Sequence, residues 1–362
     1  MGGGTAGHVS PLLAVAEALL ELTPVDLRFI GGRRGLEGDL AGAAGIRFHA
    51  VPLPSLRDPD SKLALLTHVL LVPIATIDAL AQLIRWRPDV AVTSGSFSSV
   101  PVLFAARLLR VPIYLWVGDA IPGRALRAVA RWSSGIGLTF EPALRALPGG
   151  KASVTGNPVR RSLLRWTKAD GRRALGLAAD GPVVLITGGS QGSEKINSAT
   201  FGALSRLVRR AAVVHHTGPA GLPRAQAQRA LLPEAERDRY QPHGYLREEM
   251  GAALAAADLV VGRAGSSSIA EPLAFGVPLV LIPFGAAMNA HQTANARAAA
   301  DLGAAIVLAE SDLDGDRLAA VVSGLLDDPA RLARMAANAK AAGRPDAALR
   351  IARAVLALAG CA

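Results

Sequence analysis

Three glycine-rich segments of the chain carry serine or threonine hydroxyls, a combination suited to binding phosphate groups. They span residues 2–8, 94–99 and 188–193, and the last two each follow a short apolar run. Where such a segment opens a helix, its backbone N–H groups can hold a diphosphate without a metal ion. The third segment lacks the lysine of a Walker loop, which argues against a nucleoside triphosphatase. Together the segments predict a cleft that binds a phosphorylated ligand from two sides.

Two further polar segments in the second half could contact the same ligand. The serines of residues 263–272 can cap a helix while facing a phosphate. Glu271, one turn into that helix, could accept hydrogen bonds from both hydroxyls of a ribose; alternatively, it is an ordinary glutamate near a helix N-terminus. The second segment, which could equally be the solvated start of a helix, contains Asn289, His291, Gln292 and Asn295.

His8 is the histidine best placed for chemistry, because it lies where a glycine-rich loop passes into a helix. An imidazole there can deprotonate a hydroxyl near neutral pH, although a loop histidine can also be structural. His215 and His216 lie in an apolar run and are interpreted as structural. No Asp-x-Asp lies at the end of a predicted strand, which argues against a metal-dependent sugar-nucleotide site. We expect neither a metal ion nor another cofactor.

Short apolar runs alternate with Ala- and Leu-rich helical stretches along the whole chain, which is typical of parallel sheets covered on both faces. We therefore predict an α/β fold with two doubly wound, Rossmann-like domains that meet at Gly156-Asn157-Pro158. The predicted domains are residues 1–157 and 158–344. The expected strands are residues 25–30, 47–51, 90–93, 113–117, 136–140, 153–155, 183–187, 213–217, 259–261, 279–282 and 305–308.

The first glycine-rich loop has no apolar run before it, although a loop of this kind normally follows a buried strand. We expect the recorded start to lie downstream of the true one. Ser10 and Pro11 are expected to open the following helix as its N-cap and first residue. The loop also contains the dinucleotide pattern G-x-G-x-x-G, and Arg33 or Arg34 would suit a 2′-phosphate. On this segment alone, an NADP-dependent oxidoreductase therefore remains an alternative.

The composition fits a two-domain protein with anionic ligands. The 362 residues correspond to about two domains, and the 51% hydrophobic content excludes a disordered chain. The net charge of +10 favours anionic partners, whereas 4% aromatic residues and the lack of a basic block argue against nucleic acid. A single cysteine, Cys361, excludes a disulfide framework and a multi-cysteine metal site.

Two segments suggest contact with a membrane surface. Residues 63–84 are the most apolar stretch, but the polar residues within it would be costly in a membrane interior. We predict a helix that packs on the protein or lies against a membrane, without spanning it. Arg124, Arg127 and Arg131 share one predicted helix face beside Trp132, which suits an anionic membrane surface or a solvated helix face.

The order of four motifs resembles the MurG family, the UDP-N-acetylglucosamine:lipid-intermediate N-acetylglucosaminyltransferases of peptidoglycan synthesis. The motifs are residues 3–8, 155–160, 188–192 and 265–271, and the resemblance extends from residue 2 to about residue 355. It implies a GT-B fold in which a terminal helix, residues 345–362, crosses back to the N-terminal domain. It also implies an inverting transfer of N-acetylglucosamine from its UDP donor to an undecaprenyl-diphosphate-linked muramyl-pentapeptide. The enzyme would be peripheral, at the cytoplasmic face of the cell membrane, with an anionic membrane surface and cell-wall synthesis proteins as partners.

The resemblance also implies residue roles. His8 would be the general base that activates the muramyl 4-hydroxyl, while Thr5, Ala6 and Gly7 would line the junction of donor and acceptor. Glu271 would bind the ribose hydroxyls, and the helix N-termini would stabilise the leaving diphosphate. The implied substrate-binding residues are Thr5, Ala6, Gly7, Asp119, Arg160, Ser190, Leu246, Ser266, Ser267, Ser268, Ile269, Ala270, Glu271 and Gln292. Of these, Arg160 and Leu246 would border the uracil, and Gln292 would contact the sugar.

The chain departs from the family pattern on the acceptor side. Ala6 replaces a usual glycine, and residues 116–119 read Trp-Val-Gly-Asp where the family usually has His-Glu-Gln-Asn. The motifs therefore support the identity of the donor substrate more strongly than that of the acceptor substrate. Two alternatives remain: a related GT-B transferase that glycosylates another lipid such as diacylglycerol, and a degenerate UDP-sugar-binding module without catalytic activity.

Overall fold

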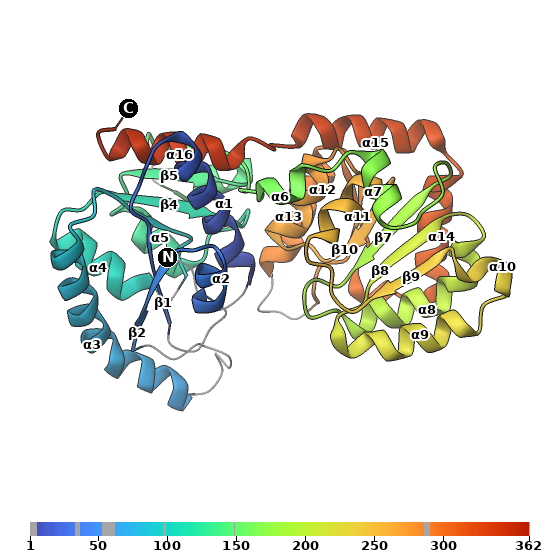
Figure 1. Cartoon of the computed structure of the whole chain (residues 1–362), viewed down its shortest axis with the longest axis horizontal. Helices are drawn as coiled ribbons and strands as arrows, with labels where there is room; N and C mark the ends of the chain where they lie inside the picture. The colour runs from blue at the N-terminus through green and yellow to red at the C-terminus, as the bar shows by residue number, and fades with distance from the viewer. Residues whose placement is uncertain are drawn as a thin grey trace. The chain divides into compact units, whose positions relative to one another are not determined.

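The chain divides into two compact units in the computed structural model, and each is described by itself (Figure 1). Unit 1 comprises Met1–Arg160 together with Asp346–Ala362, and unit 2 comprises Arg161–Pro345. The structure describes residues 6–32, 37–52, 62–96, 99–147, 149–285 and 290–361. The expected Rossmann-like α/β architecture is confirmed in both units, because all the described strand pairs are parallel.

The described strands of unit 1 form two separate parallel sheets, one of order β1-β2 and one of order β3-β4-β5-β6. Their bounds are β1 (Arg28–Gly32), β2 (Arg47–Val51), β3 (Ala91–Thr93), β4 (Ile113–Val117), β5 (Gly135–Leu138) and β6 (Ala152–Val154). The helices are α1 (Ala6–Leu22), α2 (Glu37–Ala43), α3 (Lys62–Trp86), α4 (Val100–Leu108), α5 (Arg124–Ala130), the 3-10 helix η2 (Glu141–Ala146) and α16 (Ala347–Leu358).

Helices cover both faces of these strands. On one face, α1 and α16 pack together through Val15, Leu19 and Val355, with Tyr114 and Trp116 of β4 beneath them. On the other face, α3 and α4 bury Leu83 and Val102 in a second core that also contains Ile30 of β1 and Ile113 of β4. The continuous apolar character of β4 follows from this arrangement, since all five of its residues are buried.

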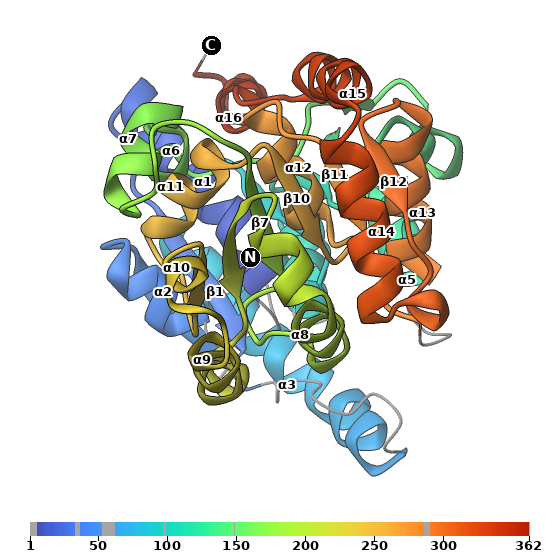
Figure 2. The same ribbon diagram turned by 90° about the vertical axis from the view of Figure 1, so that its right-hand side faces the viewer.

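Unit 2 contains one six-stranded parallel sheet of order β12-β11-β10-β7-β8-β9. In Figure 2, which turns this unit toward the viewer, α8 and α14 lie side by side, and both pack on one face of the sheet. The strands are β7 (Val183–Thr187), β8 (Ala212–His216), β9 (Tyr240–His243), β10 (Leu259–Gly262), β11 (Leu279–Leu281) and β12 (Ala305–Val307). The helices are α6 (Arg161–Leu164), α7 (Lys168–Ala174), α8 (Glu194–Val208), η3 (Pro219–Gly221), α9 (Leu222–Ala230), α10 (Glu234–Arg237), α11 (Glu249–Ala256), α12 (Ser266–Ala274), α13 (Ala290–Asp301), η5 (Glu310–Asp312), α14 (Gly315–Leu326) and α15 (Pro329–Ala342).

Two expectations for helix starts are wrong. Helix α1 begins at Ala6, so Pro11 lies inside the helix and Ser10 is not its N-cap. The N-cap of α12 is Gly265, and no side chain caps this helix, so the serines of residues 266–268 form its first turn instead. Helix α3 matches the expected apolar segment, and none of the helices, as far as the structure describes them, is both long and apolar enough to cross a membrane.

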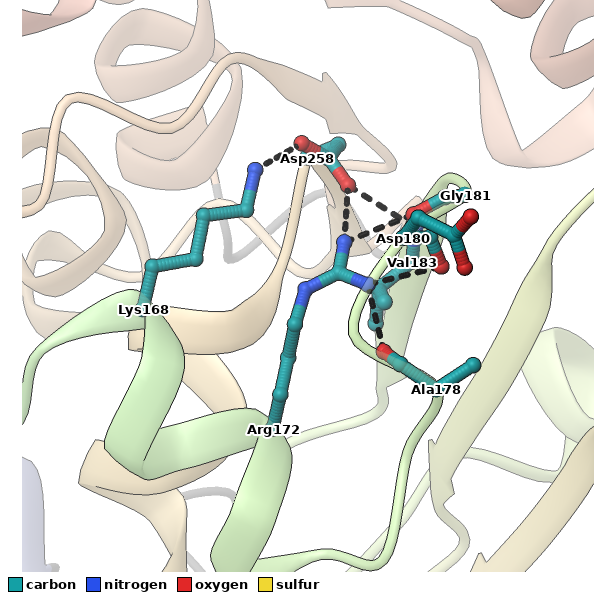
Figure 3. A network of polar contacts seen from close by, with 7 residues as sticks. All are labelled: Lys168, Arg172, Ala178, Asp180, Gly181, Val183 and Asp258. Atoms are coloured by element: carbon teal, nitrogen blue, oxygen red, sulfur yellow. Dashed lines mark hydrogen bonds and ion pairs between the residues drawn. The ribbon is translucent and has the colours of Figure 1, made fainter.

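A buried arginine of α7 connects this helix to the edge of the unit 2 sheet at which the strands begin (Figure 3). Arg172 donates hydrogen bonds to the carbonyl oxygens of Ala178 (2.9 Å), Asp180 (3.0 Å) and Gly181 (2.6 Å). It also pairs at 3.2 Å with Asp258, whose carboxylate accepts a hydrogen bond from the first N–H of β7. Lys168 pairs with the same carboxylate. Because Asp258 precedes β10, this network lies at the sheet edge where the strands begin.

Candidate functional site

The loops that carry the predicted donor-binding residues all leave one edge of the unit 2 sheet. The strands are parallel, and the last residues of β7, β10 and β11 lie in register: Gly262 pairs with Thr187 on one side and with Leu281 on the other. The segments that follow these strands therefore start side by side. In open α/β sheets, ligands bind outside this carboxyl edge.

The loop after β7 has a tightly constrained backbone. Gly189 and Gly192 adopt φ angles of +85° and +79°, which residues with a side chain rarely adopt. A Cβ at Gly192 would lie 2.1 Å from the carbonyl oxygen of Thr217, so this position has no room for a side chain. Ser193 ends the loop as the N-cap of α8 and accepts a hydrogen bond from the Ile196 N–H. The loop therefore presents exposed Ser190 at the start of a 15-residue helix.

Arg263 joins three of the loops at this edge. Its guanidinium donates to Ser193 Oγ at 2.7 Å, pairs with Glu310 Oε1 at 2.6 Å and lies 5.1 Å from the centre of the Phe284 ring. The other Glu310 oxygen accepts a hydrogen bond from the Gly285 N–H at 2.8 Å. Both charged side chains are largely buried, with 11% and 14% of their surface exposed. The pair thus ties together the loops after β7, β10, β11 and β12.

The ionised form of Glu310 is stabilised by this arrangement. Burial by itself would raise the pKa of Glu310, but the Gly285 N–H and the Arg263 guanidinium outweigh burial and hold that pKa below its usual value. Neither Arg263, the first residue of the segment 263–272, nor Glu310 was predicted to have a role at the site. Glu310 lies after β12 and belongs to no recognisable motif, so only the fold brings it to Arg263.

The first turn of α12 provides backbone N–H groups for an anion. Because no side chain caps this helix, its N-terminal N–H groups are not satisfied by a capping hydroxyl. Ser266, Ser267, Ser268 and Ala270 are partly buried, and Ile269 is fully buried. Glu271 follows in the second turn and is partly buried. The helix dipole and these hydroxyls favour a phosphate at this position.

Residues after β11 and β9 complete the carboxyl edge. Gln292 Oε1 accepts a hydrogen bond from the Phe284 N–H at 3.1 Å, so a contact with a sugar would come from its amide nitrogen. Asn295 is buried and donates to the Ala264 carbonyl, which makes it a structural link to the loop after β10. Leu246 follows β9 and is buried. Asn289 lies outside the described residues.

Two histidines of β8 contact side chains of neighbouring strands beneath this edge. His215 contacts the Tyr240 hydroxyl at 2.8 Å and Asn197 Oδ1 at 3.1 Å, while His216 Nδ1 lies 3.1 Å from Thr187 Oγ1. Burial lowers the pKa of His215 to about 3 and also lowers the pKa values of His216 and His243. All three rings are therefore neutral in the folded protein near neutral pH, as suits structural residues.

The predicted residues of unit 1 are only partly described. Ala6, Gly7 and His8 lie in the first turn of α1, but their side chains and the whole of Thr5 lie outside the described part. Asp119 follows β4 and is partly buried, and Arg160 is the last residue of the first segment of unit 1. The adjacent Trp116 is a core residue, because it is 1% exposed and donates to the Gly156 carbonyl at 3.3 Å.

Two protein-family models match the chain. The glycosyltransferase family 28 N-terminal domain matches residues 1–137, and the glycosyltransferase family 28 C-terminal domain matches residues 183–351. The second match contains every loop that forms the carboxyl edge described above.

Curated relatives match over nearly the whole chain. The UDP-N-acetylglucosamine–N-acetylmuramyl-(pentapeptide) pyrophosphoryl-undecaprenol N-acetylglucosamine transferase of Anaeromyxobacter sp. (strain Fw109-5) is 37% identical over 362 residues, covering 97% of this chain and 90% of the relative. The protein of the same name from Moorella thermoacetica is 38% identical over 356 residues, covering 96% and 94%.

Solved structures show the same two-domain architecture. MurG from Acinetobacter baumannii aligns with a TM-score of 0.77 and 25% identity, covering 99% of this chain and 98% of that structure. A UDP-GlcNAc 2-epimerase from Neisseria meningitidis aligns with a TM-score of 0.68 and 12% identity, covering 98% of each chain, a likeness of fold alone.

Proposed function

The chain belongs to the MurG family of glycosyltransferases, with the GT-B fold, and on that premise we propose that it makes a lipid-linked disaccharide for peptidoglycan. The reaction transfers N-acetylglucosamine from UDP-N-acetylglucosamine to undecaprenyl-diphosphate-linked N-acetylmuramyl-pentapeptide. The observation that carries this proposal is the match of 37–38% identity over nearly the full length of relatives with that printed activity.

The donor half of the reaction is assigned to the carboxyl edge of unit 2. Ser190 and the N-termini of α8 and α12 would hold the diphosphate, and Glu271 would accept the ribose hydroxyls. Leu246 would border the uracil and Gln292 would contact the sugar. From unit 1, Arg160 would border the uracil and Asp119 would contact the sugar. As the bond between the anomeric carbon and the diphosphate breaks, negative charge grows on UDP, and the two helix N-termini stabilise it.

The acceptor half is assigned to the first turn of α1. His8 would take the proton from the muramyl 4-hydroxyl as its oxygen attacks the anomeric carbon, with Thr5, Ala6 and Gly7 lining the junction of the substrates. Attack opposite the leaving UDP inverts the anomeric configuration. A histidine is suited to this step because its ordinary pKa lies near the working pH.

We also propose that unit 1 contacts the anionic surface of the membrane that carries the acceptor. Exposed apolar side chains project from α3 and α4, including Ile77 (69% exposed) and Phe104 (46%). Phe104 packs against Trp132 with ring centres 6.1 Å apart, and Arg127 and Arg131 are exposed nearby along the chain. Apolar residues next to cations suit the interface of an anionic bilayer.

The decisive experiment supplies the full chain with UDP-N-acetylglucosamine and one of two acceptors in vesicles, either the undecaprenyl-linked muramyl-pentapeptide or diacylglycerol. We expect UDP release and sugar transfer only with the muramyl acceptor. Transfer to diacylglycerol alone would support the second candidate, a transferase for another lipid, which the altered residues 116–119 favour. UDP binding without transfer to either acceptor would indicate a non-catalytic module.

A further inference from the structure

A buried row of polar side chains crosses unit 2 from the beginning of β9 to the carboxyl edge of the sheet. The hydroxyl of Tyr240, the first residue of β9, lies 2.8 Å from Nδ1 of His215 in β8. His215 Nε2 lies 3.1 Å from Oδ1 of Asn197 in the first turn of α8, and Asn197 Nδ2 donates to the Thr217 carbonyl oxygen at 2.9 Å. All four residues are at most 2% exposed. The row therefore joins β9, β8 and α8 to the residue that follows β8.

The hydrogen bonds of this row all run in one direction. Asn197 uses its amide nitrogen on the Thr217 carbonyl, so the amide oxygen faces His215 and can only accept. His215 Nε2 therefore carries a proton, and burial, which lowers the pKa of this histidine to about 3, leaves Nδ1 without one. Nδ1 then accepts a hydrogen bond from the Tyr240 hydroxyl. Each group consequently holds the next in a single orientation.

The row ends where the loops after β7 and β8 meet through their backbones. A Cβ at Gly192 would lie 2.1 Å from the Thr217 carbonyl oxygen, and a Cβ at Gly218 would lie 2.3 Å from the Gln191 carbonyl oxygen. Both glycines have left-handed backbones, with φ angles of +79° and +78°. Neither glycine has a side chain that could hold the two loops together. The carbonyl group that Asn197 binds is the same one that lies against the glycine-rich loop.

We propose that Asn197 is a positioning residue for donor binding: by orienting Thr217, it holds the glycine-rich loop after β7 in the shape that presents Ser190. This inference rests on the proposed function, which assigns that loop to the diphosphate of UDP. Asn197 is buried and both polar atoms of its amide have partners, so it acts through Thr217 without touching the donor. His215 and Tyr240 act one and two steps further back, by keeping the Asn197 amide in the orientation that donates to Thr217.

The test compares Asn197→Leu with Thr200→Val in the full chain. Asn197→Leu keeps a branched side chain but removes its donor and its acceptor. Thr200 is the matched control, because it is also fully buried in α8 but donates its hydrogen bond to Ile196 within the helix, at 2.8 Å. We expect Asn197→Leu to speed amide exchange at Gly189 and Gly192 about tenfold, the effect of losing one buried hydrogen bond, and Thr200→Val to leave it unchanged. Equal exchange in the two variants would overturn the proposal.

Binding and kinetic measurements connect the shape of the loop to the donor. We expect Asn197→Leu to weaken UDP binding about tenfold in calorimetry and to raise the KM for UDP-N-acetylglucosamine by a similar factor, with the KM for the muramyl acceptor unchanged. Thr200→Val is expected to change none of these values. Equal losses of UDP affinity in the two variants would reflect general destabilisation and would overturn the proposal. The proposed function would fail separately, by an absence of transfer from the unaltered chain; UDP affinity and amide exchange would still decide the role of Asn197.

A second variant keeps the test decisive if Asn197→Leu does not fold. Tyr240→Phe removes a single buried hydroxyl that is separated from Thr217 by two side chains. Because His215 Nδ1 then lacks its donor, we expect exchange at Gly192 to rise about threefold and UDP binding to weaken by a similar factor. Exchange and UDP affinity identical to those of the unaltered chain would overturn the proposal, because the row would not act on the loop.

Discussion

At the scale of single residues, the pair formed by Arg263 and Glu310 links several loops of the candidate site. It connects the segments that follow four strands, and both partners are shielded from solvent. Replacing one partner would leave the other as an unpaired charge in a largely buried place, which is costly. Loss of either partner is therefore expected to destabilise the loops that the pair connects.

Arg263→Met is expected to weaken UDP binding at least about tenfold, equivalent to about 1.4 kcal/mol. The reason is that Ser193, Glu310 and the loop after β11 lose their common partner. Isothermal titration calorimetry with UDP provides the measurement. Arg224→Met is the matched control, since Arg224 pairs with Glu194 at the start of the same helix in an exposed position. Equal losses in the two variants would show that the pair has no special role.

His8→Ala is expected to reduce turnover by about 10²–10⁴-fold, the usual contribution of a general base, with little change in UDP affinity. Single-turnover assays with the muramyl acceptor, combined with UDP titration, separate the two effects. Unchanged turnover would remove His8 from the role of base.

The buried histidines of unit 2 predict a loss of stability in acid. In the unfolded chain a histidine gains its proton near pH 6.5, whereas burial keeps the His215 ring neutral until about pH 3. Below pH 6.5 the unfolded state therefore binds more protons, and the free energy of unfolding falls as the pH drops. Urea unfolding of unit 2 at pH 7.5 and pH 5 measures this. His215→Gln keeps hydrogen-bonding groups but cannot be protonated, so we expect a weaker pH dependence; an identical dependence would refute the assignment.

At the scale of elements, the apolar runs predicted the strands well because strands buried on both faces are continuously apolar. The expected strand at residues 183–187 matches β7, and that at 113–117 matches β4. Strand β9 was missed, because it is an edge strand that contains Pro242 and is only partly buried after its first residue. Its side chains lack the apolar pattern that the prediction relied on.

The site was predictable only where its residues belong to local motifs. The glycine-rich loop after β7 is recognisable because its φ angles and close backbone contacts demand glycine. Glu310 and Asn295 are positioned by contacts between loops that are far apart in the sequence. The spacing of residues in the sequence does not indicate these contacts. The start of α1 was misjudged because Pro11 was taken as a first residue, although it lies inside the helix.

The network at the beginning of β7 predicts a stability effect that is independent of the donor site. Asp258→Ala leaves Arg172 buried without its carboxylate, so we expect a loss of about 3–5 kcal/mol in the free energy of unfolding. UDP affinity should be retained, because the network lies at the opposite edge of the sheet from the glycine-rich loop. Chemical denaturation and UDP titration test both parts.

The control for Asp258→Ala is Asp238→Ala, which removes a carboxylate that is 97% exposed and paired with Arg229. It is expected to cost no more than about 1 kcal/mol. A similar cost for the two variants would mean that the buried network adds nothing beyond a surface ion pair.

At the scale of the whole molecule, the position of the exposed apolar residues predicts which unit binds lipid. Ile77→Asp on α3 is expected to reduce sedimentation with anionic vesicles severalfold, because it places a negative charge in the proposed contact. Leu231→Asp is the matched control, as Leu231 is 77% exposed but belongs to unit 2. Equal reductions would contradict a surface confined to unit 1.

The return of α16 to unit 1 has a consequence for how the protein is made. Ile351, Ala352 and Val355 are buried against α1, which is among the earliest segments to be synthesised. On the ribosome, unit 2 is therefore translated in full before unit 1 receives its last layer of core. Until then the face of α1 that packs against α16 is uncovered. Unit 1, whose first segment is translated before unit 2, therefore completes its core only after unit 2 has been translated.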